Sequence, residues 1–102
     1  MTAVAFSGLL ILSAMLLAVG MFGVLARRGI LFQLIALEVA LAGPALAFVA
    51  AGSRHGDPAG QAMFLLTITL AAAEVAIGLA LFLRLRRLTG SDDSDAVSGL
   101  RG

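Results

Sequence analysis

The sequence predicts an all-α membrane protein with three transmembrane helices, because it is strongly apolar and its apolar residues fall into three long segments. Hydrophobic residues make up 61% of the 102 positions and charged residues 13%, whereas about a quarter of a soluble domain is charged. Each segment has about the 20 residues that a helix needs to cross roughly 30 Å of hydrocarbon. We expect the helices at about 3–26, 30–51 and 61–83.

The first apolar segment is interpreted as a retained helix and not as a cleaved signal peptide. A signal peptide has a basic start, a short apolar core and a cleavage site, whereas residues 2–26 form one uncharged run. Small residues in this run predict close packing against other helices. They are Ser7, Gly8, Ser13, Gly20 and Gly23.

Short segments of different composition separate the helices. Two arginines and a glycine at 27–29 predict a tight turn, and the Gly, Pro and Asp residues of 52–60 predict a loop. We therefore expect a single membrane domain over 1–88, followed by a polar C-terminal tail over 89–102.

The arginines predict the orientation of the helices. In a three-span chain the first turn and the C-terminus lie on one side of the membrane, and the N-terminus and second loop on the other. The first side carries Arg27, Arg28, Arg84, Arg86 and Arg87. The second loop has Arg54, which is offset by Asp57. The positive-inside rule then predicts that the N-terminus is outside and the C-terminus cytoplasmic.

Composition excludes several classes of function. Without cysteine the chain forms no disulfide, thiolate zinc site or cysteine-bound iron–sulfur cluster, and its single histidine, His55, cannot form a metal site alone. The net charge is only +1 and the arginines cluster near helix ends, so nucleic acid is not an expected partner. No motif for nucleophilic catalysis or phosphate binding is present, and we predict neither catalytic nor metal-binding residues.

Two glutamates are the main functional candidates, because each lies alone near the middle of an apolar segment. A charged side chain at the bilayer centre costs roughly 2.5–3.5 kcal/mol on insertion scales, so it normally faces protein or water and handles ions or protons. By helix rise, Glu38 lies about 14 Å beyond Gly29 and Glu74 about 15 Å before Arg84. Both are expected at one depth, as neighbours along a proton path. Alternatively, each acid only pairs with a group of an adjacent subunit.

The residues around Glu74 predict a helix face that packs against protein. Thr67, Ala71, Glu74 and Gly78 follow a helical spacing, and small residues allow another backbone to approach closely. Thr67 is expected to hydrogen-bond a carbonyl of its own helix, with a water or a carboxyl group as the alternative partner.

A proline lies within two turns of Glu38. Pro44 leaves the carbonyl of Ala40 without its helical donor, and the adjacent Gly43 lowers the resistance to bending. Gly43 and Pro44 are therefore interpreted either as a hinge or point of water access near Glu38, or as a static kink that shapes packing.

Several motifs together match a known family. They are the three-helix plan, Arg27-Arg28, the LIALEV segment around Glu38, Gly56-Asp57 followed by Gly60-Gln61, the AAAEVAIGLA segment at 71–80, and the acidic tail that ends in GLRG. With these features the chain resembles the K-subunit family of bacterial NADH–quinone oxidoreductase, respiratory complex I, over essentially its whole length.

The resemblance implies a small subunit of a proton-translocating NADH:quinone oxidoreductase in the bacterial plasma or inner membrane. It implies antiporter-like membrane-arm subunits and the lipid bilayer as neighbours. Glu38 and Glu74 would belong to the proton path coupled to quinone reduction, and Arg27 and Arg28 to assembly or coupling. FMN, iron–sulfur clusters and quinone would be bound by other subunits, so this chain would hold no cofactor and carry out no redox chemistry.

The chain also departs from the family pattern. Ala42 and Ala45 stand where asparagines are usual, which removes two polar side chains near Glu38. Two other functions are considered: a small subunit of a multisubunit cation/proton antiporter, a family that shares the three-helix plan but generally lacks the glutamate pair, and a purely structural membrane-arm linker.

Overall fold

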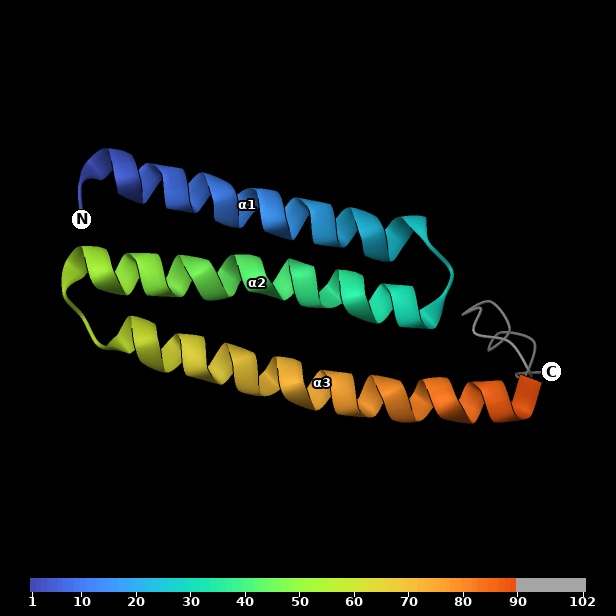
Figure 1. The fold of residues 1–102 in the computed structure, drawn as a ribbon. Coiled ribbons are helices and arrows are strands. Elements are labelled where there is room, and N and C mark those ends of the chain that lie inside the picture. Colours follow the sequence, from blue (N-terminus) through green and yellow to red (C-terminus); the bar gives the residue numbers. More distant parts are fainter. Residues whose placement is uncertain (90–102) are drawn as a thin grey trace.

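The computed structural model describes residues 1–89, which form three long helices in antiparallel order (Figure 1). Helix α1 covers Ala3–Ala26, α2 covers Ile30–His55 and α3 covers Ala59–Thr89. Helix α2 lies between α1 and α3 and packs against both (Figure 1). The tail predicted over 89–102 lies, apart from Thr89, outside the described residues.

All three helices are long and apolar enough to cross a membrane, which confirms the predicted all-α plan of three apolar spans. Few apolar side chains are buried within residues 1–89, and most of these are alanines: Ala36, Ala40, Ala45, Ala50 and Leu85. Most leucine and isoleucine side chains instead point outward. This arrangement suits a chain surrounded by lipid or by other membrane helices, since exposed apolar side chains carry no penalty there.

The observed helix ends differ from the prediction at the α2–α3 connection. Helix α1 has its predicted bounds, but α2 continues through His55 and α3 begins at Ala59, so most of the predicted loop over 52–60 is helical. Helix α3 also runs past residue 83 to Thr89. The predicted loop is confirmed at residues 56–58 but was too long, because two of its glycines, Gly52 and Gly60, serve helix packing and do not form turns.

The α2–α3 connection is short because both helix ends are capped within it. Gly56 adopts a positive φ of 63°, a conformation that favours glycine and commonly ends a helix. The Asp57 N–H donates to the carbonyl of Gly52 at 2.9 Å, and the Asp57 carboxylate accepts from the Ala59 N–H at 2.9 Å. Asp57 thus helps to end α2 and to begin α3.

Helices α1 and α2 pack closely through small residues, as the sequence predicts. A Cβ atom at Gly20 would overlap the backbone of Ala40, and one at Gly23 would lie 2.8 Å from the Cβ of Ala36. Gly8, by contrast, has no neighbouring atom within 4 Å. The close contact therefore begins deeper in α1 than the first small residues suggest.

Hydrogen bonds from side chains to backbone link α1 and α2 at both ends. Near the turn between them, the Gln33 amide nitrogen donates to the carbonyls of Val24 at 3.2 Å and Arg27 at 2.8 Å. At the opposite end, Arg54 Nη1 donates to the carbonyl of Met1 at 3.0 Å. The Val24 carbonyl lies in the last turn of α1, where carbonyls have no donor within the helix, and the Arg27 and Met1 carbonyls lie outside the helices.

Candidate functional site

Glu38 and Glu74 lie at the same level of the α2–α3 pair. The Leu34 side chain of α2 contacts Gly78 of α3, and this contact shows which positions of the two helices lie side by side. Glu38 follows Leu34 by one helical turn and Glu74 precedes Gly78 by one turn. Because α2 and α3 are antiparallel, each glutamate lies about 6 Å from the Leu34–Gly78 contact, and both lie on the same side of it along the helix axes. The acids are therefore level with each other, as the sequence predicts.

A second contact fixes the same register further along the two helices. Gly52 of α2 packs against Gly60 of α3, and a Cβ atom at Gly52 would lie 2.8 Å from the Cα of Gly60. Glu38 precedes Gly52 by as many residues as Glu74 follows Gly60. The two contacts thus agree on the level of the acids, and glycines form the close approach in both.

The two carboxyl groups have different surroundings. Glu38 is half-buried, and its Oε1 atom is buried without a hydrogen-bond partner in the described part of the chain. Glu74 is exposed on α3. Over residues 1–89 the structure contains no hydrogen bond or ion pair between them. Glu38 is thus partly enclosed by this chain, whereas the exposed Glu74 side chain can contact groups outside residues 1–89.

The helix face predicted around Glu74 is only partly correct within this chain. Thr67, Ala71 and Gly78 are half-buried, whereas Glu74 is exposed and its neighbour Val75 is half-buried instead. The contact with α2 follows two successive steps of four residues, from Thr67 to Ala71 and from Ala71 to Val75, so Val75 and not Glu74 lies in it. Glu74 therefore lies beside the contact and not in it.

Thr67 bonds within its own helix. Its hydroxyl donates to the carbonyl of Met63 at 2.8 Å, one turn earlier in α3. The expected intrahelical bond is confirmed, and the Thr67 hydroxyl is not turned toward either glutamate carboxyl.

The segment at Gly43 and Pro44 is held firmly against α1. Helix α2 is continuous through Pro44. Gly43 is buried, and a Cβ atom there would overlap the backbone of α1 at Ser13. The buried Ser13 hydroxyl donates to the Gly43 carbonyl at 2.6 Å. This bond was not anticipated, although a serine on the small-residue face of an apolar helix was a signal for it. The proposed hinge itself stays a prediction.

The arginines predicted at the α1–α2 turn lie at the surface. Arg27 and Arg28 are exposed, and the Arg27 guanidinium lies 4.6 Å from the centre of the Phe32 ring, within the range of a cation–π contact. At the nearby end of α3, the Arg86 guanidinium lies 5.9 Å from the ring centre of Phe82. Arginines of the turn and of α3 therefore gather at one end of the bundle.

The described residues include no cluster of three or more His, Cys, Asp or Glu side chains that could hold a metal ion. The chemistry that the arrangement offers is acid–base chemistry by two carboxyl groups on neighbouring helices. A carboxyl group can take up and release a proton without a metal or an organic cofactor.

Comparison with known proteins gives a consistent result over nearly the whole chain. The family described as NADH-ubiquinone/plastoquinone oxidoreductase chain 4L matches residues 8–102. NADH-quinone oxidoreductase subunit K of Rhodopseudomonas palustris strain BisA53 is 74% identical over 100% of both chains. The protein of the same name from strain BisB5 is 71% identical over 92% of each chain, and that from Acidiphilium cryptum strain JF-5 is 53% identical over 91% of each.

Proposed function

The chain belongs to the chain 4L, or subunit K, family of NADH-quinone oxidoreductases, and from this premise we propose that Glu38 and Glu74 carry protons in the membrane part of that enzyme. As a member of this family, the chain is a membrane subunit of the complex that catalyses NADH:quinone oxidoreduction. The observation that carries the proposal is the shared level of the two acids on neighbouring helices.

The surroundings of Glu38 support a role in proton transfer. Its Oε1 atom is buried and has no hydrogen-bond partner within residues 1–89. A buried polar atom without a partner is costly, so in the assembled enzyme this oxygen binds a proton, a water molecule or a group of another subunit. A carboxyl group that gains and loses such a partner is suited to relaying protons.

The exposure of Glu74 supports a lateral path. Glu38 lies on the half-buried side of α2, whereas Glu74 is exposed at the same level of α3. A proton that leaves Glu38 would therefore reach Glu74 by a step across the α2–α3 pair, and then pass to an adjoining subunit. Antiporter-like membrane-arm subunits are the proposed neighbours on this side.

The orientation and the roles of the turn arginines form the rest of the proposal. The end with Arg27, Arg28 and the last arginines of α3 is cytoplasmic by the positive-inside rule, in a bacterial plasma or inner membrane. Arg27 and Arg28 take part in assembly or coupling at that surface. FMN, iron–sulfur clusters and quinone are bound by other subunits.

The test replaces each acid by its uncharged isostere in the intact enzyme. Glu38→Gln, Glu74→Gln and the double variant are prepared in native membrane vesicles, where NADH-driven proton uptake and NADH:quinone activity are measured together. We expect proton uptake to fall in each single variant and to be lost in the double variant.

Thr67→Val is the matched control, because Thr67 lies on the same helix and its hydroxyl bonds only within that helix among the described residues. Its proton uptake should stay at the wild-type level. Undiminished uptake in an assembled double variant would overturn the proposal and favour a purely structural membrane-arm linker.

A further inference from the structure

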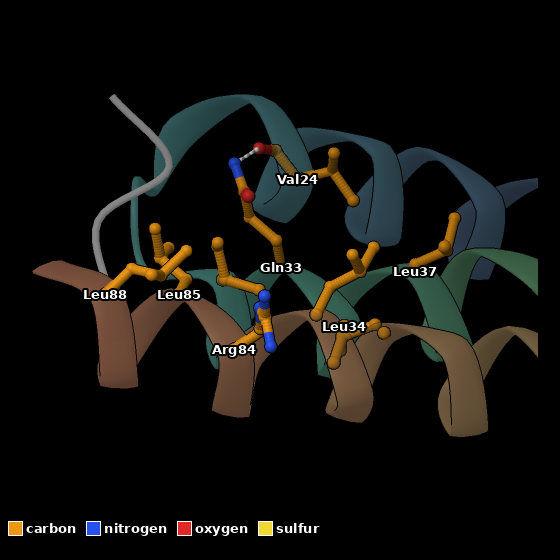
Figure 2. Close-up of a pocket in the computed structure, with 10 residues that line it drawn as sticks. Val24, Gln33, Leu34, Leu37, Arg84, Leu85 and Leu88 are labelled. Carbon is orange, nitrogen blue, oxygen red and sulfur yellow. Dashed lines mark hydrogen bonds between the residues drawn. The ribbon is translucent and has the colours of Figure 1, made fainter. Parts of the chain in front are cut away.

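A groove lies between the three helices at the arginine end of the bundle and extends to within one helical turn of the two glutamates. It has a volume of about 520 Å³, and its walls come from the end of α1, the start of α2 and the last turns of α3 (Figure 2). Figure 2 shows leucines around it, and the lining is almost entirely apolar. The apolar residues with large side chains are Val24, Ile30, Leu34, Leu37, Leu81, Leu85 and Leu88.

Two polar side chains, Gln33 and Arg84, border the groove, and of these two only Gln33 forms a hydrogen bond among residues 1–89. Gln33 donates from its amide nitrogen to the carbonyls of Val24 and Arg27. Arg84 is exposed, and within residues 1–89 its guanidinium forms no hydrogen bond, ion pair or ring contact. Among the described residues, Arg84 is therefore a charge without a counter-ion at the edge of an apolar groove.

The surrounding charge has one sign over the described residues. Arg27, Arg28, Arg86 and Arg87 lie at the same end, whereas the acidic side chains of residues 1–89 are at mid-helix or at the opposite end. Such a concentration of positive charge attracts anions at a membrane surface. The ligand of this groove is thus expected to combine a long apolar part with a negative group.

The depth of Arg84 agrees with this chemistry. Helix rise places Arg84 about 15 Å beyond Glu74 along α3, which is about half the hydrocarbon thickness of roughly 30 Å. With Glu74 near the midplane, the guanidinium lies at the level of lipid phosphates and Leu81 lies one turn deeper, among acyl chains. The groove also falls within the range of about 300–1,000 Å³ that small-molecule sites occupy, and does not require a whole helix to fill it.

We propose that this groove binds an anionic phospholipid, with one acyl chain between the leucines and the phosphate on Arg84. Basic pockets between transmembrane helices are known to suit anionic headgroups. The proposal rests on the groove and on Arg84, and it does not depend on the roles of Glu38 and Glu74. The lipid would fill the space between the ends of α1 and α3, which α2 alone does not close.

The first experiment measures which lipid occupies the groove of the intact enzyme. The complex is placed in vesicles that contain phosphatidylglycerol with a photoreactive group on one acyl chain, or phosphatidylcholine with the same chain. After irradiation, labelled peptides are mapped by mass spectrometry. We expect the anionic lipid to label the 78–88 segment several times more strongly than the zwitterionic lipid.

Two variants identify the residue that binds the phosphate. Arg84→Gln should reduce labelling by the anionic lipid to the level of the zwitterionic one. Arg86→Gln is the matched control at the same end of α3, because Arg86 already lies over Phe82, and it should keep most of the preference. Equal labelling by both lipids in the wild-type enzyme would overturn the proposal. Equal labelling is the result expected if Arg84 instead pairs with Asp92, Asp93 or Asp95, which lie outside the described residues, because the guanidinium would then not attract a lipid phosphate.

A second measurement separates lipid from protein as the occupant. A photoreactive amino acid replaces the exposed Leu81, which lines the groove. Adducts with the mass of a phospholipid support the proposal. Adducts with another subunit would show that a neighbouring chain fills the groove, and would overturn it. Loss of proton uptake in the glutamate variants, or its retention, affects neither result.

Discussion

The hydroxyl of Ser13 donates a 2.6 Å hydrogen bond to the carbonyl oxygen of Gly43, directly before Pro44 in α2. Ser13 is only 6% exposed, so this bond is shielded from solvent. It joins α1 to the part of α2 that the proline deprives of a regular helical bond. The bond fixes the Gly43–Pro44 segment a little more than one turn from Glu38, and so connects packing of α1 with the position of the acid.

The first prediction is that Ser13→Ala destabilises the assembled enzyme. Loss of one buried hydrogen bond costs about 0.5–1.5 kcal/mol, because the Gly43 carbonyl is left without its cross-helix donor. The measurement is the thermal dissociation midpoint of the detergent-solubilised complex.

Ser7→Ala is the matched control for this change. Ser7 is exposed on the same helix, and its hydroxyl has no hydrogen bond within the described residues. We expect its midpoint to equal that of the wild-type enzyme. An equal loss in the two variants would mean that the Ser13 bond contributes nothing specific.

The second prediction concerns the close approach of α1 and α2 at Gly20. A Cβ atom there would overlap the backbone of Ala40, which cannot move aside as a flexible side chain can. Gly20→Ala should therefore cost about 1–3 kcal/mol through overpacking and lower the amount of assembled complex on a native gel. Gly8→Ala, at a position with no atom within 4 Å, should leave that amount unchanged. Similar losses in both variants would contradict the packing of Gly20.

Composition and pattern predicted the number of helices and the bounds of α1, because the charged turn at 27–29 interrupts the apolar sequence sharply. They placed the second connection correctly but made it too long over 52–60, because glycines are ambiguous. A glycine marks either a turn or a close helix contact. The register of α2 against α3 shows that Gly52 and Gly60 form a contact, and of these three glycines Gly56 takes the left-handed conformation.

For the site, the shared level of Glu38 and Glu74 was predictable from their distances to the arginine end. The exposure of Glu74 was not, because a one-residue difference decides whether Glu74 or Val75 faces α2. The bond between Ser13 and Gly43 was likewise not predictable, since it depends on how far α1 is shifted along α2. Sequence spacing gives the face of a single helix, whereas these features arise from the fit of two.

The third prediction tests the contact that sets the level of the acids. A Cβ atom at Gly78 would overlap the side chain of Leu34, one turn from both glutamates. Gly78→Ala should push the Leu34 side chain aside at a cost of about 1 kcal/mol, the low end for overpacking because this side chain can move, and reduce the protons taken up per NADH oxidised. Leu34→Ala in the same chain makes room for the new methyl group, so the double variant should recover both stability and proton uptake.

The recovery is measured as a double-mutant cycle on the thermal midpoint and on proton uptake. Contacting residues couple by about 0.5–3 kcal/mol. Additive effects of Gly78→Ala and Leu34→Ala would show that the two residues do not form the contact. Full recovery of stability without recovery of proton uptake would show that the register of the helices does not control the acids.

The fourth prediction concerns the alanines that stand where related sequences are expected to carry asparagine. Ala45 is 6% exposed, so Ala45→Asn forces an amide into a packed contact at a cost of about 1–3 kcal/mol.

Ala42 is exposed one turn from Glu38, and Ala42→Asn should change stability by no more than about 0.5 kcal/mol. An amide there can hold water near the carboxyl, so we expect proton uptake to be kept or increased. Assembly and vesicle proton uptake test both variants, and a well-assembled Ala45→Asn enzyme beside an unstable Ala42→Asn enzyme would contradict the assigned helix faces.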